Sequence, residues 1–238
     1  MPDRVARIVE KELPTNKVSG VINLLADLLE KDQDVEFAYL CDQSVTQICK
    51  LRGEGNHFCA YRNIQMMLPE PHPIYSILEL QEMIEKAWNM GFNDHGRIET
   101  GGITGTRKHI GTSEAQALLQ SLNLPCKAAA FTGEKAWLEL LDSIEAHFTS
   151  GTSQRSDRII RTNRSPIFLQ RPSHSLTIVG IERDQNGKRR LLVFDPGYRQ
   201  LPEAARNWDR LTLYYYRRDE RYLSRYSNFE TLTLVNKA

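Results

Sequence analysis

The sequence predicts one α/β domain in which helices pack on a mostly antiparallel sheet. Amphipathic segments with helical spacing alternate with short β-branched runs along the chain. Two of these runs flank an Asn-Gly turn signal and therefore predict an antiparallel hairpin. A length of 238 residues with 40% hydrophobic residues suits one globular domain, with at most a small appendage.

The first 33 residues predict a helical segment that packs on the domain or extends from it, and residues 34–238 are expected to form the domain itself. Helices are expected over residues 3–12 and 18–31, on either side of a Pro-Thr-Asn break. The second helix has a broad apolar face and is expected to pack on the core. The first is a candidate arm for a protein partner.

The other elements follow from the same patterns. Expected helices cover residues 59–68, 76–92, a stretch that begins at Thr112 or Ser113, and 134–148. Expected strands cover residues 35–41, 126–131, 176–181, 191–194 and 228–235. Residues 206–218 predict a helix or an extended piece, and residues 93–111 and 150–166 predict loops.

Cys59 stands where a glycine-containing loop gives way to a helix that Pro69 and Pro71 stop. Unpaired N–H groups and the positive end of the helix dipole stabilise a thiolate at such a position. Cys59 is therefore a candidate nucleophile. The alternative is a small core residue without reactivity.

His174 precedes the first strand of the predicted hairpin, and Asp195 follows the second. Because the start and the end of a hairpin lie together, the imidazole and the carboxylate are expected to be neighbours. A cysteine with a histidine base and an orienting carboxylate is the arrangement for thiol-nucleophile catalysis. The order Cys, His, Asp along the chain matches that of papain-like proteases.

Four blocks, CAYRNIQMML, HIGTSEAQALL, FLQRPSHSLTIVGIE and LLVFDPG, resemble the C78-like peptidase domain of ZUFSP-type deubiquitinases and ubiquitin-fold-modifier proteases. The resemblance runs from about residue 20 to the C-terminus, and its details are closer to the ZUFSP branch, in a short form without zinc fingers. It implies a papain-like fold with Cys59 as the nucleophile, His174 as the general base and then acid, and Asp195 as the residue that orients the imidazole. The chain departs from the family at His57 and Phe58, where Trp-Gly is usual.

The resemblance implies hydrolysis of (iso)peptide bonds after the C-terminal glycine of ubiquitin, in polyubiquitin chains linked through ubiquitin's lysine sixty-three. A protease for the ubiquitin-fold modifier is one alternative. A catalytically inactive ubiquitin-binding protein is another, which the intact Cys, His, Asp set disfavours.

Gln47, twelve residues before the cysteine, is the candidate side-chain donor for the oxyanion, with Gln43 and Gln170 as rivals. Candidate substrate contacts are Gln170, Tyr61 and Glu99. Glu54 and Asp94 are further acidic candidates for a basic substrate tail, or else solvated surface charges.

Lys and Arg number 31 against 30 acidic residues, so no net field favours nucleic acid or an anionic membrane. No apolar run approaches the ~20 residues that span a bilayer, and the N-terminus lacks a signal-peptide core. The four cysteines form no C-x-x-C pair, which argues against zinc and disulfides. We expect a monomer in the cytoplasm or nucleus that needs no cofactor and has ubiquitin and polyubiquitin as partners.

Overall fold

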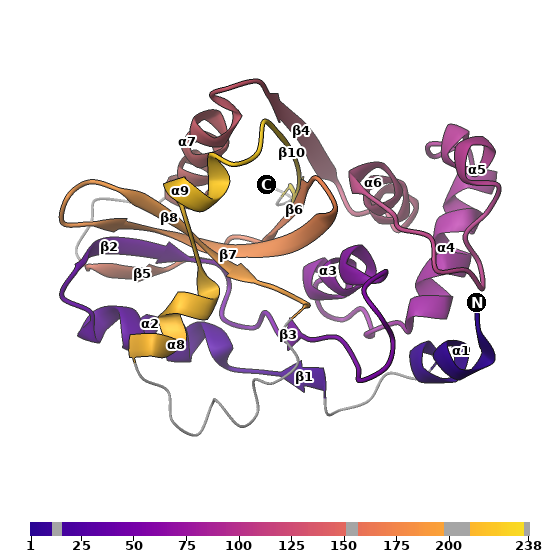
Figure 1. The fold of residues 1–238 in the computed structure, drawn as a ribbon, viewed down its shortest axis with the longest axis horizontal. Coiled ribbons are helices and arrows are strands. Elements are labelled where there is room, and N and C mark those ends of the chain that lie inside the picture. Colours follow the sequence, from indigo (N-terminus) through magenta and orange to yellow (C-terminus); the bar gives the residue numbers. More distant parts are fainter. Residues whose placement is uncertain (11–15, 151–156, 198–209, 236–238) are drawn as a thin grey trace.

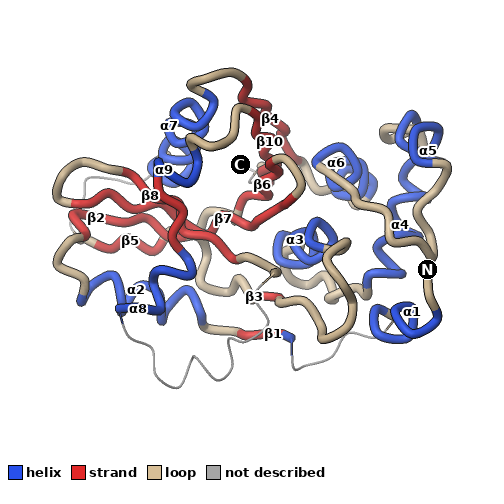
Figure 2. Tube along the Cα trace, viewed as in Figure 1, coloured by secondary structure: helices blue, strands red, loops and turns tan. Residues whose placement is uncertain are grey.

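The computed structural model describes residues 1–10, 16–150, 157–197 and 210–235. An eight-stranded sheet with helices on it forms one half of the molecule, and a group of helices forms the other (Figure 1; Figure 2). The strand order is β4-β10-β6-β7-β2-β5, and β8 pairs with both β7 and β9. Every strand pair is antiparallel except β2 with β5. The prediction of helices on a mostly antiparallel sheet is therefore confirmed.

The strands of the large sheet have these bounds: β2 Val35–Leu40, β4 Cys126–Thr132, β5 Ile159–Arg161, β6 Ile167–Arg171, β7 His174–Asp184, β8 Arg189–Phe194, β9 Arg217–Asp219 and β10 Asn228–Leu234. A separate two-stranded sheet pairs β1 (Lys17–Val18) with β3 (Gln47–Ile48). The predicted Asn-Gly hairpin is present between β7 and β8. Asp184 Oδ1 closes its turn by accepting from the backbone N–H of Asn186 and Lys188, and Gly187 supplies the positive φ of 78°.

The helices have these bounds: α1 Asp3–Val9, α2 Val21–Lys31, α3 Cys59–Met67, α4 Ile77–Asn89, α5 His95–Thr100, α6 Thr112–Ser121, α7 Ala136–Thr149, α8 Arg210–Tyr216 and α9 Glu220–Leu223. Helices α2, α7, α8 and α9 lie with the large sheet, whereas α1, α3, α4, α5 and α6 make up the other half (Figure 1). None of the described helices is both long and apolar enough to cross a bilayer.

Two groups of buried side chains fill these halves. The sheet core joins α2 and α7 to strands β2, β5, β6, β7 and β8, and the helical core joins α3, α4 and α6. Strand β6 separates the two, because Leu169 belongs to the sheet core and Phe168, on the opposite face, to the helical core. Helix α3 also contributes to both, through Met66 and Ile64. It therefore lies at the seam between the two cores.

Two predicted loops contain short regular elements. Helix α5 falls within residues 93–111, and β5 falls within residues 150–166, where it adds a parallel strand at the edge of β2. The predicted cap of α6 at Thr112 or Ser113 is wrong by one residue. Its N-cap is Gly111, whose backbone N–H donates to Glu114 Oε2 at 2.8 Å. Helix α1 ends at Val9 rather than at residue 12, and residues 11–15 lie outside the described part.

Candidate active site

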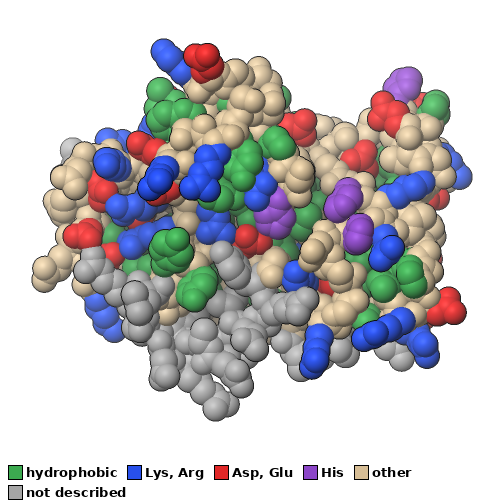
Figure 3. All heavy atoms as spheres, viewed as in Figure 1, with side chains coloured by type: hydrophobic (Ala, Val, Ile, Leu, Met, Phe, Trp, Pro, Cys, Tyr) green, Lys and Arg blue, Asp and Glu red, His purple; other side chains and the backbone are tan. Residues whose placement is uncertain are grey.

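Cys59 is the first residue of α3, as the sequence predicts, and Phe58 is the N-cap. Cys59 and His174 both line a pocket of about 370 Å³. The rest of the wall comes from the loop before α3 and from the ends of β6 and β8, namely Lys50, Glu54, Gly55, Asn56, Phe58, Arg171, Ser173, Pro196 and Gly197. Histidine side chains lie near the middle of the molecular face drawn in Figure 3, around α3.

His174 and Asp195 lie side by side at one end of the β7–β8 hairpin, as the topology predicts. His174 Nε2 is 2.9 Å from Asp195 Oδ1, and both side chains are largely buried. The carboxylate has two further donors, the Gly197 N–H on Oδ1 and the Arg218 Nη2 on Oδ2, each at 2.9 Å. Burial alone would raise the pKa of Asp195, but the His174 hydrogen bond and charge, the Gly197 N–H and Arg218 outweigh it and lower that pKa. Asp195 is therefore held as a carboxylate.

The thiol and the imidazole shift each other's proton affinity. Burial alone would raise the pKa of Cys59, yet hydrogen bonds from His174 and Ser175 lower it below its ordinary value. Burial likewise opposes the charged form of His174, but hydrogen bonds to Asp195 and Cys59 raise its pKa to about 9. Both shifts favour a thiolate facing an imidazolium. This is the activated state of a cysteine nucleophile.

The other three cysteines have the opposite electrostatic environment. Burial raises the pKa of Cys41 and Cys126, and burial with the nearby Asp195 charge raises the pKa of Cys49 to about 11. All four thiols are free of disulfide bonds. Cys59 is thus the cysteine whose surroundings lower its pKa and favour the thiolate.

A buried polar network joins α3 to β7 beside this pair. Asn63, four residues after Cys59, donates from Nδ2 to Ser175 Oγ at 2.9 Å. Thr177 Oγ1 donates to Asn63 Oδ1, also at 2.9 Å. All three side chains are 0% exposed. The network therefore ties the helix that carries the thiol to the strand that carries the imidazole.

The loop before Cys59 is fixed by a buried ion pair. Arg62 Nη2 lies 2.7 Å from Glu54 Oε2, and the Leu51 N–H donates to the same oxygen at 2.7 Å. Glu54 is 1% exposed, so the prediction that it could be a solvated surface charge is wrong. Its carboxylate already has buried partners on α3 and on its own loop. The ion pair holds the part of the pocket wall that contains Glu54 against α3.

Phe58 and His57 occupy the positions at which the chain departs from the family. Phe58 is 1% exposed in the helical core, where its ring centroid lies 5.8 Å from that of Tyr61. His57 contacts the ring of the exposed His109 at 5.1 Å between centroids. Burial and the neighbouring Arg107 lower the pKa of His57. An apolar ring is thus retained beside Cys59.

Other predicted site residues lie apart from the pocket that Cys59 lines. Gln47 is 1% exposed, and its Oε1 accepts from the Tyr216 hydroxyl at 3.1 Å. Tyr61 is fully buried, with its hydroxyl 3.4 Å from the Lys108 carbonyl oxygen, and Glu99 lies exposed on α5.

The two rival glutamines are placed differently from each other. Gln170 is half-buried and donates to the Arg171 carbonyl oxygen at 3.0 Å, while Gln43 is exposed. Neither lines the Cys59 pocket. Sequence reasoning missed Asn63, Ser175 and Arg218. For Asn63 a signal was available, since a residue four positions after Cys59 lies one turn further along the same helix face.

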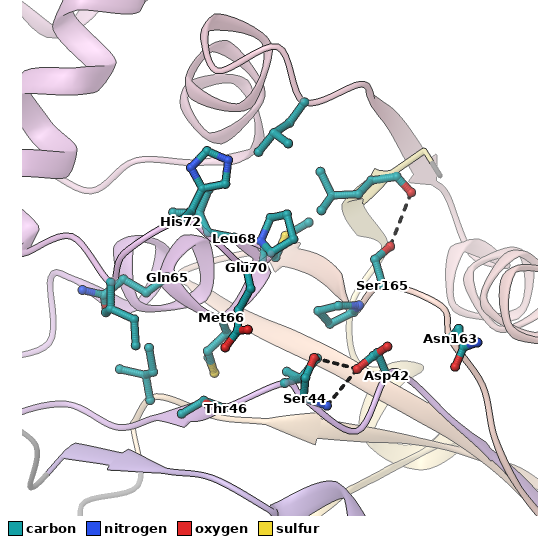
Figure 4. A pocket seen from close by; sticks show the side chains of 18 of the residues that line it. Asp42, Ser44, Thr46, Gln65, Met66, Leu68, Glu70, His72, Asn163 and Ser165 are labelled. Carbon is teal, nitrogen blue, oxygen red and sulfur yellow. Dashed lines mark hydrogen bonds between the residues drawn. The ribbon is translucent and has the colours of Figure 1, made fainter. Parts of the chain in front are cut away.

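A larger pocket, of about 610 Å³, lies at the other end of α3, where Met66, Met67 and Leu68 line it (Figure 4). Its wall contains His72 but no cysteine. The Asp42 carboxylate there accepts from the backbone N–H and the hydroxyl of Ser44. This pocket has no paired nucleophile and base. Among the described residues, no group of three or more His, Cys, Asp or Glu side chains is arranged to hold a metal ion.

Similarity to known proteins agrees with this geometry. Residues 34–232 match the family model described as peptidase family C78. The chain is 34% identical over 198 residues to "Zinc finger-containing ubiquitin peptidase 1" of Rattus norvegicus and 31% identical over 198 residues to the Homo sapiens protein of that name. Each alignment covers 76% of this chain and 34% of the relative, so the chain spans about a third of the length of these relatives.

A solved structure is similar in fold. The structure described as "Crystal structure of UfSP from C.elegans" superposes with a TM-score of 0.58 at 17% sequence identity. The match covers 88% of this chain and 36% of the other. The cysteine at the start of a helix that faces a sheet with the histidine and aspartate is the papain-like architecture.

Proposed function

The chain belongs to peptidase family C78, whose model matches residues 34–232, and on this premise we propose that it is a thiol-dependent deubiquitinase. The bond cleaved is the (iso)peptide bond after the C-terminal glycine of ubiquitin. The observation that carries the proposal is the Cys59 pocket, in which a thiol of lowered pKa faces an imidazole whose pKa is raised to about 9. The relatives named as ubiquitin peptidases support ubiquitin as the substrate.

The proposed reaction proceeds through a thioester. The Cys59 thiolate attacks the carbonyl carbon of the glycine, and His174 gives its proton to the departing amine. Neutral His174 then takes a proton from water, which attacks the thioester and releases Cys59 as a thiolate. Asp195 keeps the imidazole oriented through the 2.9 Å contact to Nε2, which leaves Nδ1 for the thiol.

The oxyanion that forms on the carbonyl needs donors. The Cys59 backbone N–H, at the N-terminus of α3, is one proposed donor. The role predicted for Gln47 stays a prediction, as do substrate contacts by Gln170, Tyr61 and Glu99. A preference for chains linked through ubiquitin's lysine sixty-three also stays a proposal, and it rests on resemblance to the ZUFSP branch. A reducing compartment, cytoplasm or nucleus, is proposed because the reaction needs a free thiolate.

Covalent probes test this function. Ubiquitin with an electrophile in place of its C-terminal carboxylate is expected to add to the protein within minutes, and the adduct should map to Cys59. Cys59→Ala should abolish labelling, whereas the matched control Cys126→Ala removes a thiol outside the pocket and should leave labelling intact. A parallel probe built on the ubiquitin-fold modifier separates the two substrates. Labelling by the modifier probe alone, or by neither probe, would overturn the deubiquitinase proposal.

A further inference from the structure

The hydrogen bonds that join Asn63, Ser175 and Thr177 have defined donors and acceptors. The Thr177 hydroxyl donates to Asn63 Oδ1, and Asn63 Nδ2 donates to Ser175 Oγ. A serine hydroxyl carries one proton and two acceptor lone pairs. Because Asn63 occupies a lone pair of Ser175 Oγ, the Ser175 proton is left for a different acceptor.

The sulfur of Cys59 is the candidate acceptor for that proton. Cys59 precedes Asn63 by one helical turn, and Ser175 follows His174 directly on β7. The hydrogen bond from Asn63 places the Ser175 hydroxyl beside the helix face that carries Cys59, and the hydroxyl and backbone N–H of Ser175 both lower the pKa of the Cys59 thiol. Ser175 is 0% exposed, so no solvent molecule competes for its proton through an open surface.

We propose that the Ser175 hydroxyl donates a hydrogen bond to the Cys59 sulfur, and that Asn63 and Thr177 are positioning residues that hold the hydroxyl in this orientation. The inference rests on the proposed function, in which Cys59 is the nucleophile. It adds to that function a donor for the thiolate that is independent of His174.

Such a donor differs from His174, whose proton moves during the reaction. His174 gives its proton to the leaving amine and takes another from the attacking water before the thiolate departs. Ser175 keeps its proton throughout, and its strand and its buried partners fix its position. A hydrogen bond to an ion is stronger in a buried environment than in water. Ser175 would thus stabilise the thiolate together with the imidazolium, both in the resting enzyme and when the thioester breaks down.

The test is the pH dependence of Cys59 alkylation by iodoacetamide, with the modified residue identified by mass spectrometry. Burial raises the pKa of the other three thiols, which keeps them out of the neutral range. Ser175→Ala should shift the midpoint of the Cys59 profile upward by about one pH unit, the effect of losing one hydrogen bond to an ion.

Thr177 supplies a matched pair of variants. Thr177→Val keeps the shape but removes the hydroxyl, and should shift the midpoint upward by a smaller amount. Thr177→Ser keeps the hydroxyl and should restore the wild-type profile. Thr162→Val is the remote control, because it removes a buried threonine hydroxyl that donates to the Leu40 carbonyl oxygen at 2.8 Å, and it should leave the midpoint in place.

If the alkylation profile of Ser175→Ala superimposes on that of the wild type, the proposal that Ser175 donates to Cys59 is overturned. If that variant does not fold, equal profiles for Thr177→Val and Thr177→Ser would overturn the network instead. The assay contains no ubiquitin, so its outcome is separate from that of the probes. If Cys59 in the wild-type protein titrates like an ordinary thiol, the result counts against its role as the nucleophile. If both covalent probes fail but Ser175→Ala still shifts the alkylation midpoint, only the proposed substrate is overturned.

Discussion

Cys59 and His174 shift each other's pKa, and under the proposed function these shifts set the pH range of activity. The pKa of Cys59 is lowered, chiefly because hydrogen bonds from His174 and Ser175 overcome burial, and the pKa of His174 is raised to about 9 by Asp195 and Cys59 against burial. Between these two values the ion pair is intact. Below the lower value the thiol is protonated, and above about 9 the imidazole has no proton to give.

We therefore expect kcat/KM toward a ubiquitin substrate to rise with pH through the Cys59 pKa, to reach a plateau, and to fall as pH rises through about 9. Initial rates at substrate concentrations well below KM, measured from pH 5 to pH 10, give this profile. Thermal melts over the same range control for unfolding. A rate that keeps rising to pH 10 would contradict the assignment of the alkaline limb to His174.

At this scale the sequence predicts residues that carry a local signal. Cys59 is marked by the change from loop to helix, and His174 with Asp195 by the Asn-Gly turn between their strands. Ser175 and Arg218 carry no such signal. Their contacts depend on how α3 and β9 pack on the β7–β8 hairpin. The sequence of any one segment does not specify that packing.

At the scale of elements, the loop before α3 depends on the buried ion pair between Glu54 and Arg62. Removing one partner leaves the other charge buried and unpaired, which is far more costly than removing both. We expect Arg62→Met to lower the free energy of unfolding by about 3–5 kcal/mol. The double variant Glu54→Leu with Arg62→Met should recover most of that loss.

Urea denaturation, followed by circular dichroism, measures both variants. The exposed pair Arg161–Asp27, at 3.5 Å, offers a control, and Arg161→Met should change stability by less than about 1 kcal/mol. An Arg62→Met protein as stable as the wild type would show that Glu54 is not confined as the structure has it.

Long, strongly periodic elements were predictable, and short ones were not. Helices α4 and α7 fall where the apolar spacing predicts them. Helix α5 has six residues and is stabilised by packing on α4. Gly96 of α5 lies so close to Trp88 of α4 that a Cβ at position 96 would meet the indole at 2.9 Å. Strand β5 has three residues in an arginine-rich segment and forms because β2 offers it a parallel edge.

At the scale of the whole molecule, the N-terminal segment is proposed to be part of the sheet core through α2. That helix buries a full face there, made of Val21, Ile22, Leu25, Ala26, Leu28 and Leu29. Helix α1, by contrast, buries Val9 alone. The predicted division into residues 1–33 and 34–238 therefore does not imply that the second part folds without the first.

We expect a protein lacking residues 1–33 to show no cooperative thermal transition, because each large core side chain contributes about 2–5 kcal/mol and total stability is about 5–15 kcal/mol. A protein lacking residues 1–10 should still melt cooperatively, at a lower temperature than the full chain. Differential scanning calorimetry distinguishes the two. Cooperative melting of residues 34–238 at the wild-type temperature would contradict the proposed role of α2.

The position of α3 at the seam between the two cores has a consequence for how the protein is made. Cys59 and His174 are far apart along the chain and meet only when α3 packs on β7. Under the proposed function, a chain still emerging from the ribosome therefore carries ordinary, weakly nucleophilic thiols, and the reactive one arises only when α3 packs on β7. Sensitivity to oxidants and to alkylating drugs is then a property that the molecule acquires at maturity.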